Sequence, residues 1–244
     1  MKIDHKKLLA FIDAVAALAP ECRVWLKDGG LETRAVDTAN VAMVSARLPK
    51  EAFAEYKSDG EGLKVMGLDI GKTKTALNIL DKTGQVTIAE NGNRIQMSDG
   101  RYNYGNMLLD VNTIRKDPNP PNIQLPAVLE IPAGELNEVI KAMALINDKV
   151  TISAKGGTLK FETEGDTDHL KKEIEGKAVK DTSEWFTSLF SLDYLKDIAR
   201  VLKGASGDIT VSLSTDHPIK FACTVEGMSV EFLLAPRIDA KEGP

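Results

Sequence analysis

The segment KKLLAFIDAVAALAPECRVWLKDGGL (residues 6–31) shares its pattern of apolar and glycine positions with GELNEVIKAMALINDKVTISAKGGTL (residues 134–159), which lies 128 residues later. At this shift apolar residues fall on apolar residues, and Gly29 falls on Gly157. The matched apolar positions are Leu8, Phe11, Ile12, Val15, Leu18, Cys22, Val24 and Leu31 in the first segment and Leu136, Val139, Ile140, Met143, Ile146, Val150, Ile152 and Leu159 in the second. This spacing predicts an amphipathic helix, a strand, a glycine turn and a second strand in each segment.

The agreement continues along both halves of the chain at slightly different shifts. A shift of 122 residues places Ile70, Ala76, Ile79 and Leu80 on Leu192, Ile198, Val201 and Leu202, and a shift of 125 places Leu108 and Leu109 on Leu233 and Leu234. We interpret the chain as an α+β protein made of two tandem copies of one unit, each with two helices and antiparallel sheets. Chance periodicity in an ordinary α+β chain is the alternative that the sequence leaves open.

Helical periodicity predicts four helices, and alternating apolar residues predict strands between them. The helices are expected at residues 6–19, 70–80, 133–147 and 192–203. Expected strands include residues 22–26, 41–48, 86–89 and 209–213, with hairpin turns at residues 28–30, 91–93, 99–100 and 155–157. Ser191 is the expected N-cap of the last helix, and Glu135 lies in the first turn of the third.

Composition restricts the class of protein. Of 244 residues 43% are apolar, and 31 basic and 36 acidic residues give a net charge of -5. This charge argues against a simple basic nucleic-acid binder but allows a basic stripe on an acidic body. Cys22 and Cys223 exclude a disulfide framework and are expected to fill core positions. No apolar run is long enough to span a membrane, and Asp4 and Asp13 interrupt the N-terminal apolar stretch, which we interpret as a helix and not a signal peptide.

A segment rich in proline separates the two copies. Residues 110–126 contain Pro118, Pro120, Pro121 and Pro126 and few large apolar side chains. Proline has no backbone N–H to donate, so this segment is expected to be an extended surface connector and neither a helix nor a central strand. The predicted domains are therefore residues 1–109 and 127–244, joined by the connector at residues 110–126.

The segment GLDIGKTKTA (residues 67–76) resembles a phosphate-binding loop. A P-loop has a glycine five positions before the second glycine, but Met66 stands at that position here. The segment also resembles the first phosphate loop of sugar-kinase-like folds, but it continues into a helical pattern and has no counterpart loop in the other half. A nucleotide-binding phosphotransferase using Gly67–Lys74 stays as the more distant alternative, and a helix at residues 72–80 would remove it.

Other residues give little indication of catalysis or metal binding. The three histidines are scattered and have no cysteine or carboxylate at metal-ligand spacing. The acidic run at residues 162–168 is more typical of a solvated loop than of a cation site. No Ser-His-Asp set is evident, although such a triad is assembled in space and the sequence alone does not exclude it. We therefore predict a protein that is not an enzyme and uses no metal or cofactor.

Basic side chains gather on the polar faces of the predicted helices. Lys196, Arg200 and Lys203 lie on one face of the last helix, and Lys74 falls on Lys196 at the shift of 122 residues. Solvated faces with local ion pairs explain this pattern equally well, because acidic residues alternate with these cations. The positive charge has the sign required of a surface that faces phosphate.

Three stretches carry a resemblance to a known family: RAVDTANVAMV (residues 34–44), FSLDYLKDI (residues 190–198) and FLLAPRI (residues 232–238). Together with the doubled halves and the connector, they resemble the proliferating cell nuclear antigen family, the sliding clamps of archaea and eukaryotes, and most closely its archaeal members. The resemblance covers almost the whole chain. It implies a homotrimeric ring of six similar domains around double-stranded DNA, with helices lining the hole, that tethers DNA polymerase and other replication and repair enzymes. Topology would hold such a ring in place, so a net acidic chain needs only weak, sequence-independent phosphate contacts.

The resemblance also implies three sets of site residues. The DNA-facing set is Lys6, Lys7, Lys72, Lys74, Lys141, Lys196, Arg200 and Lys203. The set expected to bind short hydrophobic peptide motifs of DNA polymerase, the clamp loader and other enzymes is Val36, Asn40, Val41, Pro120, Pro121, Leu125, Pro218, Leu233, Ala235, Pro236 and Ile238. The subunit-interface set is Tyr102, Tyr104, Leu170 and Ile174, on strands near residues 101–109 and 168–174 that would pair head to tail.

The chain also departs from the family pattern. Leu9 and Ala16 stand where many members carry lysines facing the hole, and the third predicted helix offers only Lys141 beside Glu135 and Glu138, so the inner wall is expected to be less basic than usual. The connector is slightly longer than in some eukaryotic relatives. A subunit of a heteromeric clamp is the nearer alternative to a homotrimer. With no targeting signal evident, the expected location is cytoplasmic.

Overall fold

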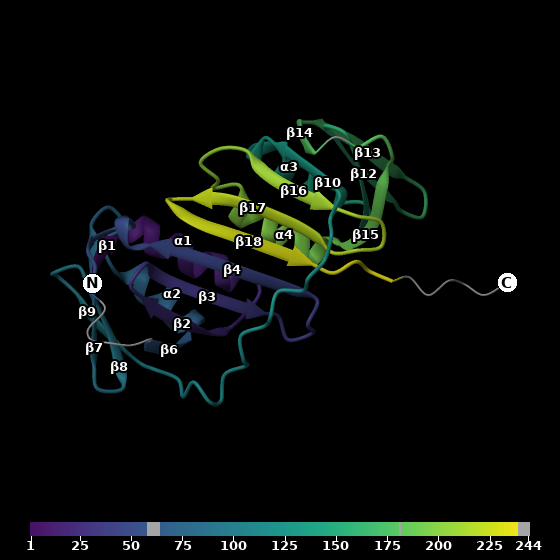
Figure 1. Ribbon diagram of the computed structural model, residues 1–244. Coiled ribbons are helices and arrows are strands. Elements are labelled where there is room, and N and C mark those ends of the chain that lie inside the picture. The colour runs from purple at the N-terminus through teal and green to yellow at the C-terminus, as the bar shows by residue number, and fades with distance from the viewer. Residues whose placement is uncertain (58–63, 181, 239–244) are drawn as a thin grey trace. The chain divides into compact units, whose positions relative to one another are not determined.

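The computed structural model describes residues 1–57, 64–180 and 182–238 (Figure 1). The chain divides into two compact units. One comprises Met1–Asn119 with Thr224–Val230, and the other comprises Pro120–Cys223 with the segment from Glu231 onward. The domain limits at residues 109 and 127 stay predictions, and residues 239–244 of the second predicted domain lie outside the described residues.

The first half of the chain contains helices α1 (His5–Ala16) and α2 (Ile70–Ile79). Its strands are β1 (Lys2–Asp4), β2 (Glu21–Lys27), β3 (Gly30–Val36), β4 (Ala42–Pro49), β5 (Phe53–Glu55), β6 (Lys64–Asp69), β7 (Gln85–Asn91), β8 (Arg94–Ser98) and β9 (Asn103–Met107), and a short 3-10 helix lies at Lys50–Ala52. Hydrogen-bonded neighbours follow two orders, β4-β3-β2-β6 and β5-β1-β7-β8-β9. The pairings are antiparallel, as expected.

The second half repeats this arrangement. Its helices are α3 (Ala133–Met143) and α4 (Leu192–Leu202). Its strands are β10 (Ala127–Ile131), β11 (Lys149–Lys155), β12 (Thr158–Glu164), β13 (His169–Glu175), β14 (Lys177–Lys180), β15 (Phe186–Ser191), β16 (Ile209–Leu213), β17 (Ile219–Val225) and β18 (Met228–Leu234). The neighbour orders are β13-β12-β11-β15 and β14-β10-β16-β17-β18, so each strand of the first half has a counterpart at the same place in the second.

The element bounds confirm the internal repeat. Helix α1 and strands β2 and β3 begin 128 residues before α3, β11 and β12, and β6 and α2 begin 122 residues before β15 and α4. Sheet order is duplicated as well as periodicity, so chance periodicity is the wrong explanation. By this correspondence β13 is the counterpart of β4, and β18 is the counterpart of β9.

The core of each half lies between helices and sheets. Helix α1 buries Leu8, Phe11, Ile12 and Val15, which recur at helical spacing, and strand β2 buries every second residue. Helices α1 and α2 contact each other in the first half, as α3 and α4 do in the second. Each large apolar side chain buried in this way stabilises the fold by about 1.5–3 kcal/mol. Among the described residues, no helix is long and apolar enough to cross a membrane.

Details at the predicted element ends differ from the structure. Helix α1 ends at Ala16 and not at Ala19, because the next residues form a tightened turn in which the Leu18 and Ala19 N–H groups both donate to the Val15 carbonyl before Pro20. Ser191 occupies the N-cap position of α4 but its side chain forms no capping hydrogen bond. The Leu192 N–H donates instead to the carbonyl of Asp148.

The two cysteines also differ from each other. Cys22 is 2% exposed, as expected for a core residue, and burial raises the pKa of its thiol to about 12. Cys223 is only half-buried, although burial still raises the pKa of its thiol to about 11. The prediction that both fill core positions is therefore confirmed for Cys22 and too strong for Cys223.

Candidate functional site

The eight cations predicted to face DNA lie on, or at the ends of, the four helices. Six of them are exposed, and Lys7 and Lys74 are half-buried. Five are engaged in ion pairs, which are Lys7–Asp4 (3.7 Å), Lys72–Asp69 (3.7 Å), Lys74–Asp13 (2.6 Å), Lys196–Asp193 (2.7 Å) and Arg200–Asp197 (3.1 Å). Within the described part of the chain, Lys6, Lys141 and Lys203 have no carboxylate partner. The helices therefore present cations that are largely neutralised locally, as the alternative based on solvated faces expected.

Strand β9 is an edge strand, with β8 as its neighbour in the sheet. The turn before it is held by Asp99, whose carboxylate accepts hydrogen bonds from the N–H groups of Tyr102, Arg101 and Asp81. These bonds lower the pKa of Asp99 to about 2. Tyr102, directly before the strand, is 55% exposed and Met107 at its end is 52% exposed, while Tyr104 is half-buried. Among the described residues no further strand pairs with β9, and exposed side chains lie along this edge.

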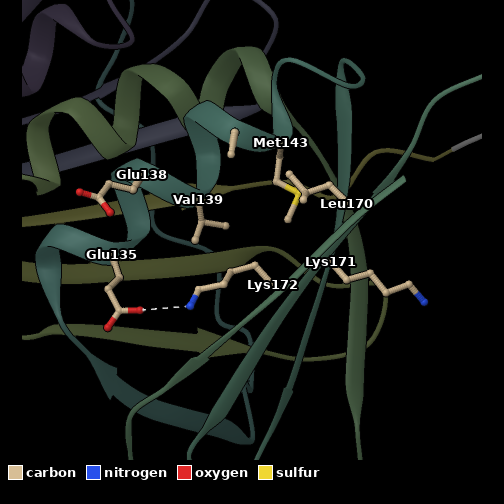
Figure 2. A pocket seen from close by; sticks show the side chains of 8 residues that line it. Glu135, Glu138, Val139, Met143, Leu170, Lys171 and Lys172 are labelled. Atoms are coloured by element: carbon tan, nitrogen blue, oxygen red, sulfur yellow. Dashed lines mark ion pairs between the residues drawn. The ribbon is translucent and has the colours of Figure 1, made fainter. Parts of the chain in front are cut away.

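Strand β13 is an edge strand of the sheet β13-β12-β11-β15, with β12 as its neighbour. Between β13 and α3 lies a groove of about 430 Å³, shown in Figure 2. Val139, Met143 and Leu170 form its apolar part. Charged side chains from α3 and β13 surround it, and the Lys172 ammonium lies 3.9 Å from the Glu135 carboxylate. The structure thus presents an apolar groove with a charged rim beside an unpaired strand edge.

One member of the predicted interface set is placed differently. The side chain of Ile174 is fully buried in its own sheet, whereas Leu170 on the same strand is half-exposed and lines the groove. The two residues are four apart, so both point to the same side of the strand, but the groove lies only over the end near Leu170. Ile174 has no exposed surface on the single chain, and its place in the subunit-interface set stays a prediction.

The loop after β3 is shaped by Asp37. The Asp37 carboxylate accepts hydrogen bonds from the backbone N–H groups of Ala39 (2.9 Å), Val41 (2.7 Å) and Ala42 (2.7 Å). Asn40 adopts a positive φ of 60° within this loop, a conformation that asparagine tolerates better than most residues. The loop keeps Asn40 exposed and Val41 half-exposed, which leaves both accessible to a partner.

The connector begins as a docked segment and not as a loose linker. Ile114 is 4% exposed, and the Arg23 guanidinium donates to the carbonyls of Val111 and Ile114. The indole Nε1 of Trp25 donates to the Asp117 carboxylate, and Arg34 donates to the carbonyl of Pro118 (3.2 Å). Connector carbonyls that have no strand partner are thereby satisfied by side chains of β2 and β3.

The segment that follows β18 is docked on the second unit. Leu234 is fully buried, whereas Leu233 is half-exposed, which confirms the predicted alternation. Arg237 donates from its backbone to the Leu189 carbonyl (2.7 Å) and from its guanidinium to Asp148 (2.8 Å). This hydrogen bond lowers the pKa of Asp148 below its usual value. Ile238 is 90% exposed.

All eleven residues of the predicted peptide-binding set are at least partly exposed. Sequence reasoning missed the residues that hold them in place, namely Arg23, Trp25, Arg34, Asp37, Arg115, Asp148 and Arg237. Of these, only Asp37 had a visible signal, because an aspartate directly after a strand and before a turn is typical of a residue that bonds the following backbone N–H groups.

A helix at residues 72–80 was expected to remove the phosphate-loop alternative, and the structure contains this helix to within one residue. Residues 70–79 form α2, and the N-terminus of this helix is capped by the Asp69 carboxylate, which accepts a hydrogen bond from the Lys72 N–H. An anionic side chain therefore stands where a phosphate would bind. Gly67 has a packing role, because a Cβ there would lie 2.4 Å from the Leu109 carbonyl and 2.6 Å from Ile114 Cδ1.

Comparison with family models places the two halves in one family. The model of the N-terminal domain of proliferating cell nuclear antigen matches residues 3–98, and the model of its C-terminal domain matches residues 119–238. DNA polymerase sliding clamp of Methanoregula boonei is 42% identical over 245 residues, which cover 98% of each chain. DNA polymerase sliding clamp of Archaeoglobus fulgidus is 34% identical, over 93% of this chain and 94% of its own.

Solved structures agree with this result. The chain matches Archaeoglobus fulgidus proliferating cell nuclear antigen, solved with the C-terminal region of FEN-1 bound, with a TM-score of 0.90 and 30% identity over 98% of both chains. Proliferating cell nuclear antigen of Thermococcus kodakaraensis matches with a TM-score of 0.84 over 97% of this chain and 99% of its own, at 21% identity, and shows the shared fold.

Proposed function

The chain belongs to the proliferating cell nuclear antigen family, and from that premise we propose that it is a DNA polymerase sliding clamp that acts without catalysis. Three copies close into a ring around duplex DNA and hold polymerase and other enzymes on the template. The observation that carries this proposal is the duplication: two equivalent units lie in tandem on one chain, each with a pair of helices and the same strand orders. Such a unit is suited to repetition around a closed ring.

Self-assembly is supported by the two strand edges. A cyclic ring needs contact between unlike surfaces of neighbouring copies, and β9 and β13 are unlike edges. The exposed Tyr102 and the half-exposed Tyr104 of one copy are candidates to fill the groove beside Leu170 in the next. Pairing of the two edges would also remove an aggregation hazard that each presents alone.

Peptide docking is supported by the accessibility of all eleven residues of the peptide-binding set. The Archaeoglobus fulgidus relative is described with the C-terminal region of FEN-1 bound to it, and we refer to that segment as the tail peptide. We propose that this chain binds equivalent tails of DNA polymerase and other replication and repair enzymes. Exposed apolar side chains of this kind would contact hydrophobic anchor side chains of such a tail and leave the rest of the peptide extended.

The weak basic character of the helices agrees with a clamp held by topology. Five of the eight predicted DNA-facing cations are already paired with carboxylates, so they offer phosphate only shallow, exchangeable contacts. A protein held by charge alone would lose DNA steeply as salt rises. A closed ring keeps its DNA without such contacts, and loose contacts allow it to slide.

The test of this function is retention on closed and open DNA. The chain is loaded by a clamp loader onto nicked circular duplex, and the salt is then raised until direct binding to short duplex is lost. We expect the chain to stay on the circle and to leave once a restriction enzyme linearises it. Equal loss from circular and linear DNA would refute encirclement, and equal retention on both would indicate ordinary binding by contact.

Neutralising Lys74, Lys196 and Arg200 together, each to glutamine, is expected to reduce the salt dependence of binding to short duplex DNA. Full phosphate contact by three cations would contribute about 2.7 to the slope of log K against log salt. Because each cation is paired with an aspartate, we expect a smaller reduction of about 1–2. Fluorescence anisotropy at several salt concentrations measures the slope.

The matched control neutralises three exposed lysines outside the helices, Lys82, Lys155 and Lys177, and changes the net charge equally. This control is expected to leave the slope close to that of the unaltered chain. An equal reduction in both triple variants would mean that only overall charge matters, and the assignment of Lys74, Lys196 and Arg200 to the DNA side would be wrong.

A further inference from the structure

Arg115 joins two segments that the peptide-binding set uses. Its guanidinium donates a hydrogen bond of 2.6 Å to the backbone carbonyl of Asp37, at the start of the loop that carries Asn40 and Val41. Arg115 belongs to the connector, and Asp37 belongs to the loop after β3. The two residues are 78 positions apart in sequence, and both belong to the first unit.

Each of the two segments also has hydrogen bonds of its own at this point. The loop is held by the three hydrogen bonds that the Asp37 carboxylate accepts, and Asp37 is only 5% exposed. The connector is held by Arg23, Trp25 and Arg34 from the sheet. Arg115 differs from these residues because it reaches out of the connector to the loop. It therefore fixes the loop and the connector relative to each other.

The position of Arg115 extends its influence along the chain. Three residues later the connector reaches Pro118, and then Pro120 and Pro121, which restrict the backbone to an extended course. An anchor at Arg115 thus fixes the course of the connector as far as Pro118, within the first unit. A binding segment that is ordered before a ligand arrives loses less conformational entropy on binding than one that the ligand has to order.

We propose that Arg115 is a positioning residue for partner-peptide binding, one that holds the connector against the Asp37–Val41 loop so that both are ordered before a peptide arrives. This inference rests on the proposed peptide-binding function. Arg115 is exposed and need not touch the peptide. Its effect is transmitted through the Asp37 carbonyl.

The test compares Arg115→Ala with Arg115→Lys and with Lys116→Ala. Lysine keeps a cationic donor that can reach a carbonyl, and Lys116 is an exposed neighbour with no partner within the described part of the chain. Calorimetry with the tail peptide is expected to show binding about three- to tenfold weaker for Arg115→Ala, the loss of one charge-assisted hydrogen bond at an exposed site. Arg115→Lys is expected to recover most of the affinity, and Lys116→Ala to keep it.

Tryptophan fluorescence supplies a readout that needs no peptide. The chain has two tryptophans, and in a Trp185→Phe background Trp25 alone reports on the connector, because its indole donates to Asp117. We expect Arg115→Ala to make Trp25 more accessible to a neutral quencher such as acrylamide, with the melting temperature unchanged. The Lys116→Ala variant should behave as the background does.

The possible failures are separable. Unchanged peptide affinity in Arg115→Ala, while the unaltered chain binds peptide, overturns the positioning role and leaves the proposed function in place. Unchanged quenching of Trp25 in Arg115→Ala also overturns the positioning role, because the connector would then be held without Arg115. Absence of tail-peptide binding by the unaltered chain overturns the proposed peptide function itself.

Discussion

Replacing Leu233 with glutamate is expected to abolish binding of the tail peptide and to leave the assembly intact. Leu233 lies on β18, where its neighbour Leu234 is fully buried and Leu233 itself is half-exposed. A carboxylate at this position would have to lose its hydration against the apolar anchor of a peptide. We expect the dissociation constant to rise by more than about 100-fold, which corresponds to about 2.7 kcal/mol.

The matched control for Leu233→Glu is Ser229→Glu. Ser229 is an exposed residue of the same strand, and because it lies four positions away its side chain points to the same face. The substitution Ser229→Glu adds the same charge outside the peptide-binding set, so calorimetry should show nearly unchanged affinity for the tail peptide. Solution mass and melting temperature of both variants should equal those of the unaltered chain. Peptide binding by Leu233→Glu at normal affinity would mean that the peptide binds elsewhere on the chain.

The internal repeat made most of the fold predictable from sequence. The apolar spacing placed α1, α2, α3 and α4 to within a few residues, and the glycine turns placed the β2–β3 and β11–β12 hairpins. These features are local, because they depend on side-chain periodicity and on backbone conformations that glycine favours. The two copies also strengthen each assignment of a helix or strand, because a wrong assignment in one half would have to recur at the matching position in the other.

Contacts between distant segments were not predictable in the same way. Arg115 and Asp37 are separated by 78 residues, and a lone arginine in a proline-rich segment gives no signal of its acceptor, which is a backbone carbonyl. Ile174 shows the opposite problem. Ile174 lies on the same face of the same edge strand as Leu170, but the structure buries Ile174 completely and leaves Leu170 half-exposed beside the groove, a difference that strand periodicity alone does not predict.

The helix cations were located correctly by periodicity, but their electrostatic state was not predictable in full. The i, i+3 pairs Lys196–Asp193 and Arg200–Asp197 follow from sequence spacing. The Lys74–Asp13 pair joins α2 to α1 and depends on how the two helices pack. This pair makes Lys74 less available to DNA than its helical position alone suggests, which is why the expected change in salt dependence is smaller than a simple count of cations would give.

Replacing Leu170 with glutamate is expected to convert the proposed trimer into single chains. Leu170 lines the groove between β13 and α3 together with Val139 and Met143, and Glu135 and Glu138 lie at its rim. A new carboxylate would place a charge in the apolar part of the groove and would lose water on contact with an aromatic side chain of the next copy. We expect subunit affinity to fall more than about 100-fold, as for a central interface residue.

Light scattering at micromolar concentration measures this effect directly. The measured mass should fall from about 80 kDa for a trimer to the 26.5 kDa of one chain. The control Glu173→Gln alters an exposed residue of β13 outside the groove and should keep the trimer mass.

Unchanged melting of a Leu170→Glu monomer would separate loss of assembly from loss of folding. If the unaltered chain is itself monomeric at every concentration, it requires a different chain as its neighbour, and the heteromeric clamp becomes the better description. If Leu170→Glu stays trimeric, the β13 groove is not the surface that closes the ring.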